Sequence, residues 1–331
     1  MYGTTFVSYR VAFDRGRGER CYTSVRCAPP GLGCRPKILP STAAICGRFK
    51  PSSCSCSSKP HSRITDSAAC STLLVMAVSM TFVLIIGGID LSVGSVMALA
   101  ASIMSLAMVH WGCGMLAAAS LGLVTGLISV GWRVPSFIVS LGMLEIARGM
   151  AYEVTHSRTE YIGGIVAGIS APVFMGMSPA FMAAILIVIA GQLVLTSTVL
   201  GRLWIGIGTN QEAVRLSGID PRPSKVLVFA MMGLLAGVGA LFQISRLEAA
   251  DPNGGVGLEL QVIAAVVIGG TSLMGGRGSV ISTFIGVLII VVLEAGLAQI
   301  GVSEPLKRIV TGLLIVSAVV LDTYRRHGQR V

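Results

Sequence analysis

Residues 76–101 read MAVSMTFVLIIGGIDLSVGSVMALAA, in which two apolar runs are separated by Gly-Gly-Ile-Asp. Inside a bilayer no water satisfies backbone N–H and C=O groups, so apolar runs of this kind must be helical. About 20 helical residues cross the ~30 Å of hydrocarbon, and comparable apolar stretches recur between residues 71 and 322. The pattern predicts an all-α protein, a polytopic bundle of transmembrane helices.

Composition agrees with a membrane protein and argues against nucleic-acid binding. The 331 residues are 53% hydrophobic and 12% charged, whereas about a quarter of residues are charged in ordinary globular proteins. The net charge of +10 belongs mostly to residues 1–70, which hold eleven Lys and Arg against three Asp and Glu. The rest of the chain carries fourteen basic and twelve acidic residues, so it has no excess that would favour nucleic acid.

Residues 1–70 differ from the rest of the chain. They contain seven of the eight cysteines and many Arg, Ser and Pro, without a sustained helical or strand period, which predicts loop or disorder. Cys54 and Cys56 lie near His61, but the C-x-C spacing matches no usual zinc pattern, so we expect no metal site. The abrupt change near residue 70 favours a mis-start or frameshift artefact over a native domain.

The transmembrane domain is predicted over residues 71–326, with 327–331 as a cytoplasmic tail. Two pairs of glycines spaced four apart, Gly122 with Gly126 and Gly233 with Gly237, would let helix backbones approach closely. The common occurrence of glycine in membrane helices is the alternative explanation. The nine candidate spans are 71–88, 91–109, 112–132, 135–154, 180–199, 225–244, 259–273, 280–300 and 306–322.

Lysine and arginine in short loops set the orientation. The loop 200–225 and the C-terminal tail are both basic, and the four spans between them keep both on the cytoplasmic side. Counting back places the basic residues before residue 71 outside the cell, a conflict that one more span upstream would remove. We therefore expect one N-terminal span to be missing. The basic residues used are Arg133, Arg202, Arg215, Arg222, Lys225, Arg325, Arg326 and Arg330.

The junction between the first two spans carries polar groups. Asp90, Ser92 and Ser95 place one acid and two hydroxyls between apolar runs. An ionisable group at membrane depth costs at least ~2.5–3.5 kcal/mol and usually faces protein or a water-filled path. Two interpretations stay open: Asp90 caps the helix that follows, or these side chains line a substrate pathway.

The segment AAVVIGGTSLMGGRGSV, residues 264–280, carries a second group of candidates. It superficially resembles a phosphate loop, but Gly276 and Arg277 stand where the Lys-Ser/Thr pair is required, so we exclude a nucleotide site. The glycines favour a broken helix whose backbone groups line a cavity, with a tight turn between spans as the alternative. The helix-breaking glycines are Gly269, Gly270, Gly275 and Gly276, and the pathway candidates beside them are Thr271 and Ser272.

The loop GRLWIGIGTNQEAVRLSGIDPRPSKV, residues 201–226, predicts a short helix on the cytoplasmic side. Asn210 or Thr209 can cap it, Gly218 can end it, and Pro221 with Pro223 prevents its continuation. Such a helix between two spans can dock on a partner protein, or it can be an ordinary surface helix.

Other polar residues in the spans form no catalytic grouping. Glu145 and Arg148 are three residues apart and can pair on one helix face. Neither H-E-x-x-H nor G-x-S-x-G occurs in the sequence, and we therefore expect no enzyme.

Together these motifs resemble the ABC-importer permease family that includes the ribose, xylose, galactose and autoinducer-2 permeases. The resemblance covers residues 71–326 and stops before residue 71, where family members carry a first helix. It implies about ten helices in a bacterial inner membrane, a second permease copy, a periplasmic sugar-binding protein and separate ATPase subunits. ATP and Mg²⁺ would be used by the ATPase partner, and this chain would bind no cofactor. The matching stretches are MAVSMTFVLIIGGIDLSVGSVMALAA, GRLWIGIGTNQEAVRLSGID, SRLEAADPNGGVGLEL and IAAVVIGGTSLMGGRGSV.

The resemblance also implies a mechanism. Glu212, Ala213 and Gly218 match the family's E-A-x(4)-G coupling segment, which contacts the ATPase, while Val214 replaces the usual second alanine. The chain would pass a monosaccharide into the cytoplasm by alternating access. The alternatives are a branched-chain amino-acid permease and an ion-coupled secondary transporter using acidic residues such as Asp90. A secondary transporter has no ATPase subunit for the cytoplasmic helix to contact.

Overall fold

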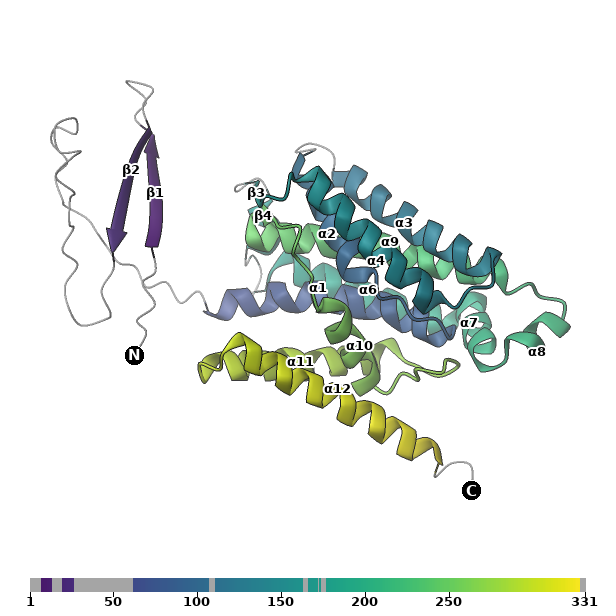
Figure 1. The fold of residues 1–331 in the computed structure, drawn as a ribbon. Coiled ribbons are helices and arrows are strands. Elements are labelled where there is room, and N and C mark those ends of the chain that lie inside the picture. Colours follow the sequence, from purple (N-terminus) through teal and green to yellow (C-terminus); the bar gives the residue numbers. More distant parts are fainter. Residues whose placement is uncertain are drawn as a thin grey trace, which may run out of the picture. The chain divides into compact units, whose positions relative to one another are not determined.

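A computed structural model describes residues 7–13, 20–26, 62–106, 111–162, 166–171, 173 and 177–327. The chain divides into two compact units, residues 1–59 and 60–331. The first unit holds an antiparallel hairpin of β1 (Val7–Phe13) and β2 (Arg20–Arg26), in which Val7 is paired with Arg26 (Figure 1).

This hairpin differs from the loop or disorder that the sequence predicts for residues 1–70. Its first strand, VSYRVAF, places apolar residues at every second position, which is the period of a strand, but the pattern lasts only seven residues. Cys54, Cys56 and His61, considered above for zinc, lie outside the described residues. The origin of the segment as an artefact stays a prediction, and a helix already begins at Ser62.

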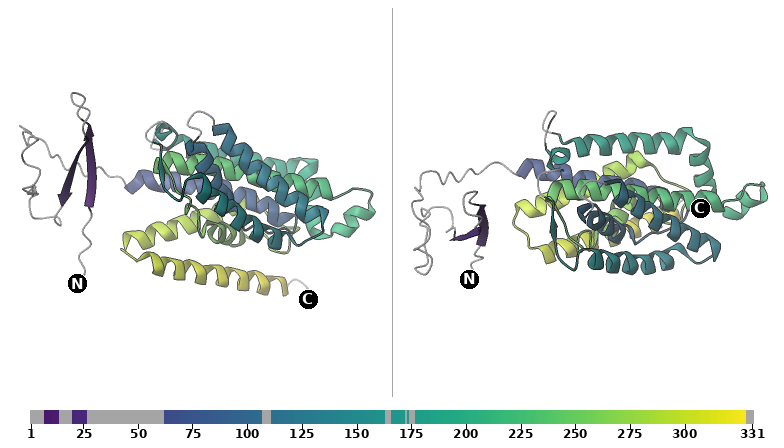
Figure 2. Two further views of the ribbon diagram at one scale, coloured as in Figure 1. Left: turned by 45° about the horizontal axis from the view of Figure 1, so that its top comes forward. Right: turned by 90° about the horizontal axis from the view of Figure 1, so that it is seen from above.

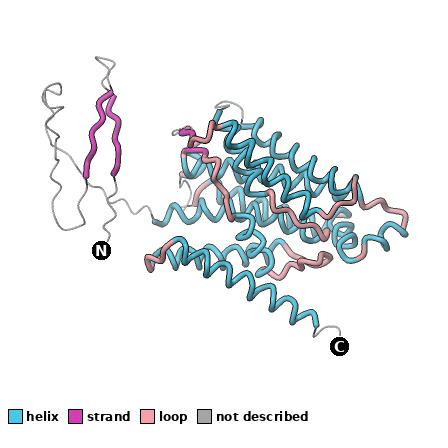
Figure 3. The backbone as a smooth tube through the Cα atoms, in the orientation of Figure 1, coloured by secondary structure: helices cyan, strands magenta, loops and turns pink. Residues whose placement is uncertain are grey.

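The second unit is helical, which confirms the helical class predicted from the sequence (Figure 3). It also contains a two-residue ladder, β3 (Glu160–Tyr161) paired antiparallel with β4 (Ala249–Ala250), which the sequence analysis did not predict. The helices are α1 (Ser62–Ile85), α2 (Val93–Leu106), α3 (Trp111–Gly131), α4 (Ser136–Val154), α5 (Ala167–Ser170), α6 (Pro179–Ser197), α7 (Val199–Thr209), α8 (Gln211–Leu216), α9 (Arg222–Leu247), α10 (Leu258–Ile268), α11 (Val280–Gln299) and α12 (Glu304–His327).

Each predicted span corresponds to one helix, but the helices differ in length. Within the described residues, four are long and apolar enough to cross a membrane: Gly112–Gly131 of α3, and α6, α9 and α11. In contrast, α10 has 11 residues, too few to cross ~30 Å of hydrocarbon at 1.5 Å per residue, and α2 is described over 14 residues, up to Leu106. The count of nine crossing spans therefore stays a prediction.

Helix α1 forms the core of this unit. It contacts α9, α11, α6 and α10, and Figure 1 shows it running between α9 and the layer of α10, α11 and α12. Nearly all of its residues from Cys70 to Ile85 are buried, including Leu74 and Met76 at 0% exposure. A helix that is apolar all round has no polar face to present to water, so it is enclosed by its neighbours.

Glycines bring α3 and α9 together. A Cβ on Gly122 would lie 3.0 Å from the Cα of Gly233, and one on Gly126 would lie 3.1 Å from a backbone atom of α9. A Cβ on Gly237 would lie 2.8 Å from the Cα of Met115 in α3. These are the two glycine pairs predicted from their spacing, and the close-packing interpretation is confirmed.

The two ends of the helical unit carry different elements. Figure 1 and both views of Figure 2 show α7 and α8 at one end and β3 with β4 at the other. Arg133, Arg215, Arg222 and Lys225 line one cavity at the α8 end. The sequence predicts that these basic residues share one side of the membrane, and the structure confirms that they lie together. The positive-inside rule assigns that end to the cytoplasm.

Candidate functional site

Helix α8 is a short helix with defined signals at both ends, as predicted for the loop 201–226. Asn210 is its N-cap, and the Ala213 N–H donates to Asn210 Oδ1 at 3.0 Å. At the other end Gly218 has φ +87°, and its N–H donates to Arg215 O at 3.0 Å while the next N–H, from Ile219, reaches back to Val214 O. This pair of bonds is a Schellman motif, which needs glycine for its left-handed residue.

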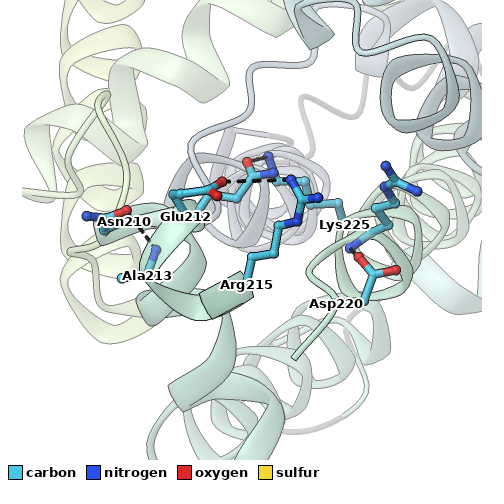
Figure 4. Close-up of polar contacts among 8 residues, drawn as sticks. Asn210, Glu212, Ala213, Arg215, Asp220 and Lys225 are labelled. Carbon is cyan, nitrogen blue, oxygen red and sulfur yellow. Dashed lines mark hydrogen bonds and ion pairs between the residues drawn. The ribbon is translucent and has the colours of Figure 1, made fainter. Parts of the chain in front are cut away.

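Helix α8 lies at the surface of the bundle. None of its residues is buried, and Leu216 and Ile219 are 80% and 48% exposed. Figure 4 shows the pair of Glu212 and Arg215, whose charged atoms lie 4.0 Å apart. Lys225 anchors the helix to α9 by donating to Gln211 Oε1 at 2.6 Å. Exposed apolar residues at the end of a small helix and just after it form a surface that another protein can cover.

A cavity of about 640 Å³ lies beside α8. It brings together α8, the start of α9, the connection between α3 and α4, and the backbone that follows α1. Two of the predicted coupling residues, Glu212 and Gly218, line it. The charged residues in its wall are Glu212, Asp220, Arg133, Arg215, Arg222 and Lys225.

The junction between α1 and α2 is an extended segment that runs along the start of α4. Ile89 N–H donates to Ser136 Oγ at 3.0 Å and Leu91 N–H donates to Ser140 Oγ at 3.1 Å. Asp90 is 2% exposed and its Oδ1 accepts from both the N–H and the hydroxyl of Ser92, at 2.8 and 2.6 Å. The carboxylate thus fixes the residue just before α2 instead of binding N–H groups of the helix itself.

The hydroxyl of Ser95, on the first turn of α2, is 0% exposed and has no hydrogen-bond partner. The hydroxyl of Thr271, in the loop 269–279, is likewise 0% exposed and without a hydrogen-bond partner, and Ser272 in the same loop is also buried. The role of these side chains in a substrate pathway stays a prediction, since the cavity beside α8 is lined by other residues.

Glycines end α10 and turn the chain toward α11. Gly269 is the C-cap of α10, and Gly270, Gly275 and Gly276 all have positive φ, from 75° to 88°. Residues with a Cβ rarely adopt this conformation, so Gly270, Gly275 and Gly276 favour the turn that follows α10, while Gly269 keeps a right-handed helical φ of −63°. The backbone of the loop is hydrogen-bonded internally, with Ser272 N–H donating to Arg277 O at 2.9 Å.

The three segments singled out in the sequence meet at the C-terminal end of α1. Gly276 N–H donates to Ile85 O at 2.9 Å. A Cβ on Gly275 would lie 2.9 Å from Gly87, and one on Gly208 of α7 would overlap the Ile85 carbonyl. We call Gly87, Gly208, Gly275 and Gly276 the glycine junction. Sequence reasoning missed Gly208, because only the fold shows which backbones pass beside it.

Arg148 does not form the helix-face pair predicted with Glu145. Its Nη1 donates to Pro252 O at 2.7 Å and to Gly254 O at 3.0 Å, in the loop between β4 and α10. The two backbone carbonyls belong to a non-helical loop and have no helical N–H to bind, so they require a donor such as this guanidinium. The carboxylate of Glu145 is exposed and can be solvated without Arg148. The prediction of a structural Glu145–Arg148 pair was wrong in its partner.

Two glutamine side chains join helices across the unit. Gln192 Oε1 on α6 accepts from the Val280 N–H at 2.9 Å and from the Ile281 N–H at 3.3 Å, so it satisfies free N–H groups at the start of α11. Gln261 on α10 donates to Glu294 on α11 at 2.6 Å. Within the described residues, no three His, Cys, Asp or Glu side chains gather as a metal site.

Comparison with known proteins places this sequence in a family. The model of the branched-chain amino acid transport system/permease component matches residues 67–319. The ribose import permease RbsC of Escherichia coli K12 is 38% identical over 272 residues, covering 76% of this chain and 82% of the relative. The L-arabinose permease AraH of Azospirillum brasilense is 33% identical, covering 77% and 78%. The ribose import permease of Bacillus subtilis is 35% identical, covering 75% and 80%.

No solved structure gives a significant match. The matched region begins within α1 and ends within α12, so it includes all the helices that build the glycine junction and the cavity beside α8. Several apolar helices and these relatives identify a multi-pass protein of the bacterial inner membrane. The chain therefore belongs to the family of permease components of binding-protein-dependent ABC transport systems.

Proposed function

We propose that this chain is the membrane permease of an ATP-driven monosaccharide importer, which receives sugar from a periplasmic binding protein. The observation that carries the proposal is α8, a helix with no buried residue and with defined caps at both ends, beside a charged cavity at the basic end of the bundle. Such a helix serves a subunit that docks from the cytoplasm. The names of the relatives, ribose and L-arabinose permeases, supply the substrate class.

In this proposal Glu212, Ala213 and Gly218 form the contact with the ATPase subunit. That subunit binds and hydrolyses ATP with Mg²⁺, and the permease chain itself carries no cofactor and catalyses no bond cleavage. Lys225 ties α8 to α9, while α7 leads from α8 to the glycine junction. Movement of α8 would therefore reach the end of α1 through backbone contacts.

The pathway itself would run through a dimer with a second permease copy, surrounded by lipid. Asp90, Ser92 and Ser95 before and within α2, with Thr271 and Ser272 after α10, are its proposed polar lining. All five are buried, and α10, with 11 residues, is too short to cross the membrane alone. Alternating access would expose these groups first to one side and then to the other.

The test is uptake into proteoliposomes that contain the permease, its ATPase and its binding protein. We expect ATP-dependent uptake of labelled ribose or arabinose and none of leucine. Leucine uptake under ATP would favour the branched-chain amino-acid alternative. Sugar uptake driven by a proton or sodium gradient without ATP would favour a secondary transporter and overturn the proposal.

A further inference from the structure

Two short helices meet at their first turns in this bundle. Gly94 is the second residue of α2 and Glu259 is the second residue of α10. A Cβ on Gly94 would lie 2.7 Å from Glu259 Oε2, so only glycine leaves room for the carboxylate here. Each helix presents free N–H groups and a partial positive charge at this end. Two positive helix ends thus converge on one carboxylate.

The two oxygens of Glu259 are used differently. Oε1 accepts from the Gly257 N–H at 3.2 Å, next to the start of its own helix. Oε2 is buried and has no hydrogen-bond partner. The hydroxyl of Ser95, the residue after Gly94, is also fully buried and unpartnered. Glu259 as a whole is half-buried, but its Oε2 atom is an acceptor without a partner, which costs ~1–3 kcal/mol or more for a charged group.

The loop before α10 leads to this point from the β3–β4 end of the unit. Arg148 holds its carbonyls at Pro252 and Gly254, and Tyr152 donates to Asn253 Oδ1 at 2.6 Å. Asn253 is exposed, whereas Gly255 packs on α2, where a Cβ would lie 2.9 Å from Gly94 O. The closed contact is therefore made by the backbones of Gly94 and Gly255 together with the side chains of Glu259 and Met97.

We propose that Glu259 contacts the transported sugar, accepting hydrogen bonds from sugar hydroxyls through Oε2 when α2 and α10 separate. This inference rests on the proposed function of sugar import. A carboxylate only accepts hydrogen bonds, whereas each sugar hydroxyl carries a donor, and the Ser95 hydroxyl can donate or accept. The two positive helix ends oppose a bound cation, so neutral hydroxyl donors fit this site better than a coupling ion does.

The competing explanation is that Glu259 only caps α10 through Oε1. Glu259→Gln separates the two, because its amide keeps a carbonyl oxygen for the Gly257 N–H but loses the charge. A matched control is Glu294→Gln on α11, where the carboxylate already has Gln261 as its partner.

The experiment uses the complete transporter in proteoliposomes. We expect Glu259→Gln to lower ATP-dependent sugar uptake about tenfold, the ratio for a lost hydrogen bond to a charged group. ATP hydrolysis stimulated by the binding protein should persist, and Glu294→Gln should stay within about twofold of the parent. A series of monodeoxy sugars, corrected for binding-protein affinity, gives the second readout. Deleting the contacted hydroxyl should slow the parent and leave Glu259→Gln unchanged.

Unchanged uptake in Glu259→Gln, while the parent transports sugar, overturns this inference alone. A parent that transports no sugar overturns the proposed function as well. If Glu259→Gln does not assemble, Glu259→Asp replaces it, since this variant keeps the charge and withdraws the carboxylate by one methylene. Equal deoxy-sugar profiles for Glu259→Asp and the parent would then rule out the contact.

Discussion

Gly218→Ala changes the end of α8 without adding a clash. Gly218 has φ +87°, and no atom lies within 4 Å of a Cβ built on it. The substitution therefore acts only through backbone strain, which costs about 1–2 kcal/mol for an L-residue in the left-handed region. The Schellman bonds of Gly218 and Ile219 are the interactions put at risk.

The helix has little stability with which to oppose this strain. It has six residues, none buried, and the ion pair it carries, between Glu212 and Arg215, is 4.0 Å long and exposed. A helix this short is marginal in water, and a surface pair adds well under ~1 kcal/mol. A loss of 1–2 kcal/mol lowers the ratio of folded to unfolded α8 by about 5- to 30-fold. Because the helix is marginal, we expect the affinity for the ATPase subunit to fall by up to the same factor.

The assay is the Kd of the detergent-solubilised permease for its ATPase subunit, with ATP hydrolysis as a second readout. Gly218→Asn should retain most of the affinity, because asparagine tolerates the left-handed region. Gly112→Ala is the matched control, since Gly112 lies in α3 with no neighbour within 4 Å and no positive φ. Equal affinities for Gly218→Ala, Gly218→Asn and the parent would refute the view that α8 docks as a preformed helix.

Three further predictions concern stability, measured by unfolding in mixed micelles. Gln192→Leu removes the acceptor of the Val280 N–H and should lower the free energy of unfolding by about 1–3 kcal/mol; no change would mean that water replaces the amide. Gly237→Ala forces α3 and α9 apart and should cost about 1–3 kcal/mol, while Gly149→Ala, which meets no atom within 4 Å, should cost nothing. Arg148→Met should speed hydrogen exchange in the loop between β4 and α10 at least tenfold, and unchanged exchange would show that the loop holds itself.

The helices and their packing glycines were predictable because their signals are local. Apolar runs mark the spans, and the four-residue spacing of Gly122 and Gly126 anticipates the contact of α3 with α9. Asn210 and Gly218 likewise mark the ends of α8, since a cap and a left-handed glycine act within a few residues of the chain.

Long-range partners were not predictable in the same way. Arg148 lies three residues from Glu145, yet it binds carbonyls more than a hundred residues away. Gln192 satisfies an N–H group at the start of α11, 88 residues further along the chain, and nothing in its own stretch of sequence indicates that partner. The unpartnered carboxylate oxygen of Glu259 was not predictable either, because an acid at the start of an apolar helix resembles an ordinary cap. A single sequence carries no record of which segments the fold brings together.

The prediction of loop or disorder for the segment that forms the β1–β2 hairpin was wrong for a different reason. The alternation of Val7, Tyr9, Val11 and Phe13 was present in the sequence, but a seven-residue period of two is weak beside the cysteines, prolines and serines that follow. Composition described the whole segment, whereas a strand depends on only its own residues and their partners.

Helix α10 connects the two sites on which the functional proposals depend. Before it, Gly255 packs on Gly94 beside Glu259; after it, Gly275 and Gly276 pack on the end of α1. The helix itself is about 17 Å long. Contiguity alone does not couple two sites, because some element between them needs two stable arrangements. Glycines pack on backbone before and after α10, whereas the middle of the helix is held by the buried Val262 and Ala265 and by the hydrogen bond from Gln261 to Glu294. We therefore expect α10 to shift together with α11. Motion of α8, passed through α7 to the glycine junction, would then act on Glu259 through the rigid body of α10.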